Sequence, residues 1–205
     1  MIQELLMKAI NHERMRQRLT DLNRYFYNRK HETQIRDELV IILNEIGPFA
    51  ALSEHPKIAA GAVDLSLYEP HTSQPLPCIC TASIELKHHY PKDLLYRQVQ
   101  EDILSDITRK VAVQTTHFIH IIQQRSVHQL PSLGAVKYLG RNADSISDCV
   151  STLENLPAFI SCVLSKQSIA IEVPGDITSV YTFNVYTLGR ELHKTALALA
   201  PAGTQ

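Results

Sequence analysis

The sequence predicts a single-domain α/β protein with a mixed central sheet, on two observations. Segments with apolar residues every three or four positions, the period of an amphipathic helix, alternate with shorter segments whose apolar residues recur at every second position, the period of a strand. Of the 205 residues, 44% are hydrophobic, which is enough for one substantial core. We expect that core to span residues 31–125, with a helical extension over residues 1–30 and an elaboration of the same domain over residues 126–205.

The first elements are helical. Ile2 to Tyr27 carries apolar residues at irregular three- and four-residue intervals among charged ones, which predicts one or two amphipathic helices. From His31 to Ile46 the apolar residues form one stripe, and Gly47-Pro48 supplies a helix stop. Glu38 and Glu45, seven residues apart, are expected to lie together on a flank of this helix.

Three strands are predicted next, at Phe49 to Glu54, Ala62 to Glu69 and Ile79 to His89. The polar, proline-containing stretch from His71 to Pro77 is expected to be the loop between the last two. Each strand is bounded by turn-forming residues, so the three can pair as neighbours.

A long helix from Leu94 to Val113, apolar at four-residue intervals, and a buried strand from His117 to Gln124 complete the order helix, three strands, helix, strand. The C-terminal part is expected to contain, in order, a helix from Ser145 to Ser165, hairpin strands at Ser168 to Val173 and Ser179 to Leu188, and a closing helix from Arg190 to Leu199.

Charge and cysteine content narrow the class of protein. A formal net charge of −1 gives no global field that attracts nucleic acid and counts against a non-specific coat protein. No stretch approaches the roughly 20 apolar residues of a membrane-spanning helix and no signal peptide is evident, so a cytoplasmic protein is expected. Four cysteines are too few for a disulfide framework, and no second close pair joins Cys78 and Cys80 in a zinc site.

Basic side chains are concentrated near the N-terminus, although for any single one a solvated helical face is the simpler explanation. They are Arg14, Arg16, Arg18, Arg24, Arg29 and Lys30.

Three ionisable residues interrupt the apolar pattern of neighbouring strands. Asp64 lies in the second predicted strand, and Glu85 and Lys87 lie in the third. Because strand side chains alternate, Glu85 and Lys87 project to the same side, and antiparallel pairing would place Asp64 beside them. Two converging carboxylates need a cation or a raised pKa. Mg²⁺, with Mn²⁺ as a substitute, suits the site because it takes one or two carboxylates and keeps its other positions for water and phosphate oxygens.

The segments GAVDLSLYE and ASIELKHHY resemble the signature of the PD-(D/E)xK nuclease superfamily, which includes restriction endonucleases and Holliday-junction resolvases. The resemblance covers about Glu32 to Gln124 and implies a restriction-endonuclease-like α-β-β-β-α-β core. Asp64, Glu85 and Lys87 match the motif, and Val63 stands where the name-giving proline would be.

The resemblance implies further site residues. Members of the superfamily often recruit an acid from the first core helix, for which Glu38 is the best match by position and Glu45 the alternative. Many also carry a polar residue on the helix after the motif, which Gln98 matches and Asp102 matches less well.

Four histidines are considered as additional ligands because they lie in or near the predicted motif strands. His88 and His89 follow the motif and could touch a phosphate, but strand-end histidines usually face solvent. His117 and His120 are three apart, which puts them on opposite faces of a strand, so a metal shared between them is not expected.

The function predicted from these residues is that of a Mg²⁺-dependent endonuclease acting on DNA phosphodiesters. Asp64, Glu85 and the backbone carbonyl of Leu86 would hold the metal, and Lys87 would position the water for in-line attack. A homodimer is implied by the resemblance, with the N-terminal arginines and the C-terminal hairpin supplying DNA-backbone contacts or a dimer surface. The alternatives are a catalytically silent module that binds nucleic acid or a protein partner, and a hydrolase of some other phosphodiester.

Overall fold

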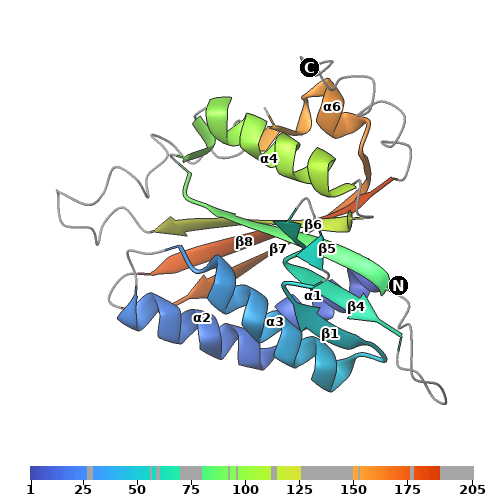
Figure 1. Cartoon of the computed structure of the whole chain (residues 1–205). Coiled ribbons are helices and arrows are strands. Elements are labelled where there is room, and N and C mark those ends of the chain that lie inside the picture. Colours follow the sequence, from blue (N-terminus) through green and yellow to red (C-terminus); the bar gives the residue numbers. More distant parts are fainter. Residues whose placement is uncertain are drawn as a thin grey trace.

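The computed structural model of the chain describes residues 1–26, 30–55, 57–58, 61–69, 80–91, 93–95, 97–111, 115–125, 150–151, 153–175 and 178–189. Their main feature is a six-stranded mixed sheet between two layers of helices, so the predicted α/β class is confirmed (Figure 1). The helices are α1 (Ile2–Ile10), α2 (Glu13–Tyr25), α3 (Glu32–Ile46), α4 (Arg97–Val111) and α6 (Pro157–Ile160), with a 3₁₀ turn η1 (Asp93–Leu95). The strands are β1 (Ala50–Ser53), β2 (Lys57–Ile58), β3 (Gly61–Ala62), β4 (Leu65–Tyr68), β5 (Cys80–His89), β6 (Thr115–Arg125), β7 (Val163–Val173) and β8 (Ser179–Leu188).

The large sheet has the order β1-β4-β5-β6-β8-β7. Its neighbours pair antiparallel except β5 and β6, which are parallel and are joined by the crossover that contains α4. The strands β2 and β3 form a separate two-stranded pair between β1 and β4 in the chain. The C-terminal hairpin belongs to the same sheet, because β8 pairs with β6 over nine residue pairs.

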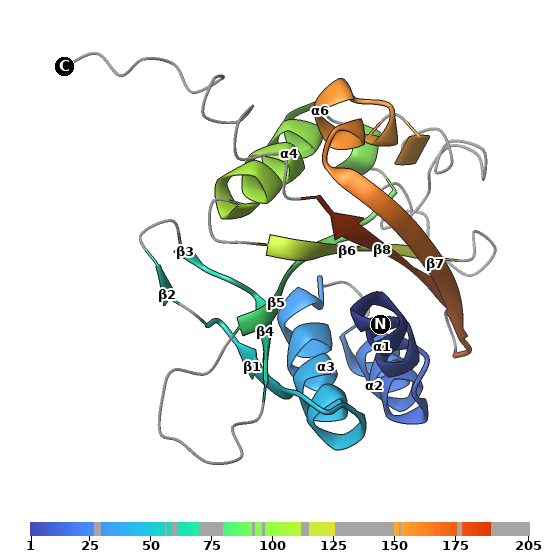
Figure 2. The same ribbon diagram turned by 90° about the vertical axis from the view of Figure 1, so that its right-hand side faces the viewer.

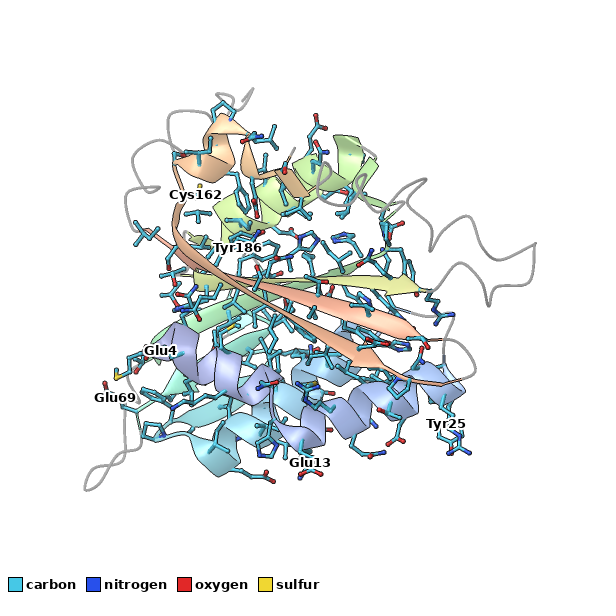
Figure 3. All side chains as sticks on the ribbon, turned by 180° about the vertical axis from the view of Figure 1, so that it is seen from behind. Glu4, Glu13, Tyr25, Glu69, Cys162 and Tyr186 are labelled. Carbon is cyan, nitrogen blue, oxygen red and sulfur yellow. The ribbon has the colours of Figure 1, made fainter. Side chains whose placement is uncertain are left out.

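Each face of the sheet buries its own apolar layer. Figure 2 shows α1, α2 and α3 together on one side of the sheet and α4 with α6 on the other. The first layer packs the helical stripe of α1–α3 onto the inner strands, with Leu39, Leu86 and Phe183 among its buried members. The second packs α4 and α6 onto the other face through Phe118 and Tyr186, and Figure 3 shows Tyr186 on this side, away from Glu13 on the outer surface of α2.

Several predicted elements are confirmed. The N-terminal segment forms two amphipathic helices, and the side chain of His12 caps the second by accepting a hydrogen bond from the Arg14 N–H. The helix α3 ends where predicted, because Gly47 before Pro48 takes an extended conformation. The elements α3, β1, β4, β5, α4 and β6 follow one another as helix, three strands, helix and strand, with the short β2 and β3 between β1 and β4.

Two predicted elements are wrong in extent. The strand expected over Ala62 to Glu69 is divided into β3 and β4, and Asp64 lies in the bend between them. The helix expected over Ser145 to Ser165 stops before Pro157, because a proline disfavours the helical conformation of the residue before it, and β7 already begins at Val163. The expected loop at 71–77 and closing helix at 190–199 lie outside the described residues.

Among the described residues, no helix combines the length and the apolar character that crossing a bilayer requires.

Five histidines of the described residues are buried, four of them in β5 and β6 and the fifth, His31, at the start of α3. His88 and His89 are 1% and 8% exposed, so the expectation that they face solvent is wrong. Burial lowers the pKa of His31 to about 4, of His88 to about 3 and of His89 and His117 to about 4, and it holds the pKa of His120 well below its usual value. These side chains are therefore neutral in the folded protein at neutral pH.

The buried histidines predict an acid-sensitive fold. Their folded pKa values lie below the unfolded value near 6.5, so between about pH 6.5 and pH 4 the unfolded chain binds more protons and stability falls as pH falls. A histidine shifted from 6.5 to about 4 contributes roughly 3 kcal/mol to this loss. Urea unfolding at pH 7.5 and 5 should show the fall, and His120→Gln should reduce it, with exposed His55→Gln as the control. Equal stability at both pH values would contradict the prediction.

Candidate active site

The three predicted motif residues lie together beside β5. The antiparallel register of β4 and β5, extended one residue before the start of β4, sets Asp64 opposite Glu85. Asp64 Oδ2 accepts a hydrogen bond of 2.9 Å from the Leu86 N–H. Lys87 Nζ lies 3.4 Å from Glu85 Oε1, as expected for residues two apart on one face of a strand.

The site lies where the sheet splits. The pairing of β4 with β5 begins at Cys80 and reaches Ile84, so the last residues of β5 have no β4 partner on that edge. Two backbone N–H groups of β5 beyond Ile84 donate to carboxylates at this edge. The Leu86 N–H donates to Asp64, and the His88 N–H donates to Glu32 Oε2 at 2.8 Å. Because the N–H and C=O of one strand residue point to the same side, the Leu86 carbonyl also faces this opening.

The ammonium of Lys87 joins both helical layers to β5. Its Nζ lies 2.9 Å from Asp106 Oδ2 of α4, and its charge also acts on Glu32 of α3. Burial by itself lowers the pKa of Lys87, but the hydrogen bond with Asp106 and the charges of Glu85 and Glu32 outweigh burial, so the pKa is raised. Lys87 is 23% exposed and Glu85 is fully buried, so the lysine lies between the buried acid and solvent.

Glu32 is the acid that α3 contributes, and the sequence analysis missed it. Burial raises its pKa and the Asp64 charge raises it further, against the lowering effects of Lys87 and of the hydrogen bond from His88. These mutual effects place Glu32 in the same cluster as Asp64 and Lys87. Its position in the first turn of α3 was the feature of the sequence that could have identified Glu32, because that turn lies at the open end of β5.

Glu38 and Glu45, the predicted α3 acids, lie elsewhere. Arg14 of α2 bonds the Glu38 carboxylate and lies 2.9 Å from Glu45, and Arg18 lies 3.8 Å from Glu38. The pair does share one flank of α3, as expected from its spacing. That flank of α3 faces α2. Residues six apart on an α-helix are about 120° apart around its axis, so Glu38 does not point in the direction of Glu32.

Gln98 is also outside the cluster. It donates a hydrogen bond of 3.0 Å to Asp102, and both side chains are exposed on α4. Asp106, one turn beyond Asp102, is the α4 residue that reaches Lys87. Its position between the buried residues Ile103 and Ile107 directs it toward the sheet, which was the available signal.

A pair of hydrogen bonds fastens the start of α3 to β5. The His31 N–H donates to His88 Nδ1 at 2.9 Å, and the His88 N–H donates to Glu32. His31 and His88 are both buried, and their ring centroids are 6.2 Å apart. We call this pair of bonds the α3 clamp; it fixes where the Glu32 carboxylate lies.

The donor chemistry of the cluster fits a hard divalent cation. Among the described residues, four carboxylates, those of Glu32, Asp64, Glu85 and Asp106, lie near the Lys87 ammonium or the open edge of β5. Oxygen ligands of this kind suit Mg²⁺ or Mn²⁺. No three His, Cys, Asp or Glu side chains in the described part of the chain converge closely enough to form a complete metal site alone. The predicted ligand set instead combines two carboxylates with a backbone carbonyl.

No protein-family model, no curated protein and no solved structure matches this chain.

The α3 clamp can be tested without an activity assay. In His88→Ala the His31 N–H loses its acceptor, which should cost about 1–3 kcal/mol of stability and expose that amide to exchange. His88→Asn offers a side-chain oxygen near the position of Nδ1 and should restore much of the protection. Hydrogen exchange of the His31 amide, followed by NMR, distinguishes the variants. A His31 amide that is equally protected in His88→Ala would show that the clamp does not hold the helix.

Proposed function

We propose that the protein is a metal-dependent endonuclease that hydrolyses DNA phosphodiester bonds and belongs to the PD-(D/E)xK nucleases. The observation that carries the proposal is the gathering of Asp64, Glu85 and Lys87, joined by Glu32, at the open edge of β5. Asp64 lies just before β4, and Glu85 and Lys87 lie on β5, an arrangement that resembles the one the motif requires.

The arrangement of the elements gives a second line of support. The motif strands β4 and β5 are antiparallel, a helix precedes them as α3, and α4 leads to β6 parallel to β5. A restriction-endonuclease-like core has the same order of helices and strands. We therefore include that fold in the proposal, with β8 and β7 as an extension of the core sheet.

The metal would be held by Asp64, Glu85 and the Leu86 carbonyl. When bound, a divalent cation would polarise a phosphoryl oxygen and lower the pKa of a water molecule. Glu85 is fully buried, so its charge is costly to maintain unless cations compensate it. Asp64 is held in place by the Leu86 N–H, which leaves its other oxygen for a further ligand.

Lys87 would act on the reacting groups as a fixed positive charge. An ammonium has three N–H donors; Lys87 bonds Asp106, and Glu85 Oε1 lies 3.4 Å from Nζ. A donor not engaged by Asp106 would hold the attacking water or a phosphoryl oxygen, which stabilises negative charge as it develops. Glu32 and Asp106 would be positioning residues, because they fix the lysine from α3 and α4.

Several of the N-terminal basic residues, which were expected to contact DNA, are engaged by acidic side chains of the protein itself. Arg14 and Arg18 are occupied by Glu38, and Lys30 lies 2.9 Å from Asp93. Arg24 lies over the exposed ring of Tyr25, and Arg16 bonds Asn11 on the surface. Contacts with a DNA backbone would therefore come from Arg16 and Arg24, on the face of α2 that does not pack against α3.

Cleavage assays test the proposal with matched variants. Supercoiled, linear and single-stranded DNA should be cut with Mg²⁺ or Mn²⁺ but not with EDTA. Lys87→Ala should lower the rate by about 100-fold or more, because it removes a preorganised charge. Glu32→Gln should also lower it, whereas Glu38→Gln, on the same helix but outside the cluster, should cut like the wild type. Equal losses from both α3 variants would refute the assignment of Glu32.

Metal binding is tested separately by calorimetry. Mg²⁺ should bind the wild type and Glu38→Gln equally, and Asp64→Asn or Glu85→Gln should weaken binding by at least about tenfold, because each removes a charged ligand. Metal binding without cleavage of DNA would indicate another phosphodiester as substrate. If the folded wild type neither bound metal nor cut any substrate, the catalytically silent module would replace the nuclease.

A further inference from the structure

Two neighbouring aromatic side chains are exposed at the C-terminal end of α2. Tyr25 is 62% exposed and Phe26, which follows the last residue of the helix, is 53% exposed. No other tyrosine or phenylalanine of the described residues is exposed to this extent. Figure 3 shows Tyr25 at the tip of α2, on the outer surface. Large apolar side chains that are exposed as neighbours, unlike single ones, indicate an interaction surface.

The groups around the two rings carry positive charge. The Arg24 guanidinium lies over the Tyr25 ring, 5.3 Å from its centroid. This contact uses the face of the guanidinium, so its N–H groups, which lie in its plane, can still bind a phosphate oxygen. Arg16, about two turns earlier, bonds a neutral side chain, that of Asn11. After its first turn α2 contains one acid, Asp21, so its exposed face carries an excess of positive charge.

This combination of rings and cations matches a single strand of nucleic acid. Unpaired bases have flat faces that stack on tyrosine and phenylalanine rings, and the phosphates of the strand bind the guanidinium groups beside them. In a duplex the bases stack on one another and present only their edges, so exposed rings gain little from it. A partner protein would also cover the rings, but the flanking cations favour a polyanion.

The two rings lie close to the acidic cluster. The ring of His31 hydrogen-bonds the backbone of Phe26, and the α3 clamp holds His31 to β5 next to Glu32. Glu32 is six positions after Phe26, so the two backbones are at most about 21 Å apart. Stacked nucleotides follow one another at about 3.4 Å, so about six of them span this distance. A strand held by the rings can therefore reach the open edge of β5.

We propose that Tyr25 and Phe26 are a stacking platform for unpaired bases, and that the substrate cut at β5 is DNA with a single-stranded segment. Arg16 and Arg24 bind the phosphates of the stacked nucleotides. The cleavage part of this inference rests on the proposed nuclease function. The binding part does not, because no residue of the acidic cluster takes part in it.

Binding is measured in EDTA, so that no strand is cut. By fluorescence anisotropy, the wild type should bind an oligothymidine of about 12 nucleotides more tightly than a duplex of the same length. Tyr25→Ala/Phe26→Ala should weaken binding of the single strand by about tenfold or more, because the base–ring stacks are lost. Tyr25→Trp/Phe26→Trp keeps two rings and should bind as the wild type does. Ile160→Ala, which removes an apolar side chain of similar exposure on α6, is the control.

Two results of the binding measurement would contradict the platform. A wild type that binds no single strand, or that prefers the duplex, would overturn the proposal and leave the rings to a partner protein. A double alanine variant that is folded by circular dichroism and binds the single strand like the wild type would overturn it as well.

Cleavage assays then separate the platform from the nuclease. With Mg²⁺, the wild type should cut a duplex that carries a single-stranded end of about six nucleotides at least about tenfold faster than a blunt duplex. Tyr25→Ala/Phe26→Ala should lose this advantage and cut the blunt duplex like the wild type. If both proteins cut every substrate equally, the platform is refuted and the nuclease stands. If neither cuts but the rings bind the single strand, the nuclease and its substrate are refuted and the platform stands.

Discussion

The mismatch in length between β4 and β5 is the constraint on which the candidate site depends. The strand β4 has four residues and β5 has ten, so the C-terminal half of β5 has no β4 residue paired with it on that edge. A buried N–H without an acceptor is costly, and here Asp64 and Glu32 supply the acceptors. Two carboxylates are thus brought to one edge next to the buried Glu85. The Lys87 ammonium offsets part of the cost of gathering them, and burial raises the pKa of Glu32.

The same constraint explains why part of the site could be predicted from the sequence and part could not. Asp64, Glu85 and Lys87 followed from alternation along two strands, a local property that neighbouring residues reveal. Glu32 could not be predicted in this way. It reaches β5 only where the pairing with β4 has ended, and no local sequence pattern shows where that pairing ends. Glu38 was favoured by its position on the predicted helix. In the fold, Arg14 and Arg18 of α2 bind its carboxylate, so the flank of α3 that carries Glu38 faces α2.

The limits of the fold prediction have similar causes. The sequence indicates the order of elements from α3 to β6 because each has a clear period and a clear end, such as Gly47-Pro48. It does not indicate that His88 and His89 are buried, because their burial depends on neighbours far away in the chain. The His88 ring lies under the start of α3 at His31, and the His89 ring lies against His120 of β6. The early start of β7 was missed because exposed Ser165 and Lys166 weaken the alternation typical of a strand.

The cluster at β5 differs from the ion pairs between α2 and α3 in how deeply its charges lie. At the α2–α3 interface, Arg14 and Arg18, which are 45% and 40% exposed, meet Glu38 and Glu45. At the open edge of β5, the Lys87 ammonium lies beside Glu85, which is completely buried, and beside Asp106. Asp64 and Glu32 bond backbone N–H groups of the same strand. Carboxylate oxygens beside a backbone carbonyl are ligands that a hard divalent cation can use, and this chemistry is why we propose a metal-dependent reaction at β5.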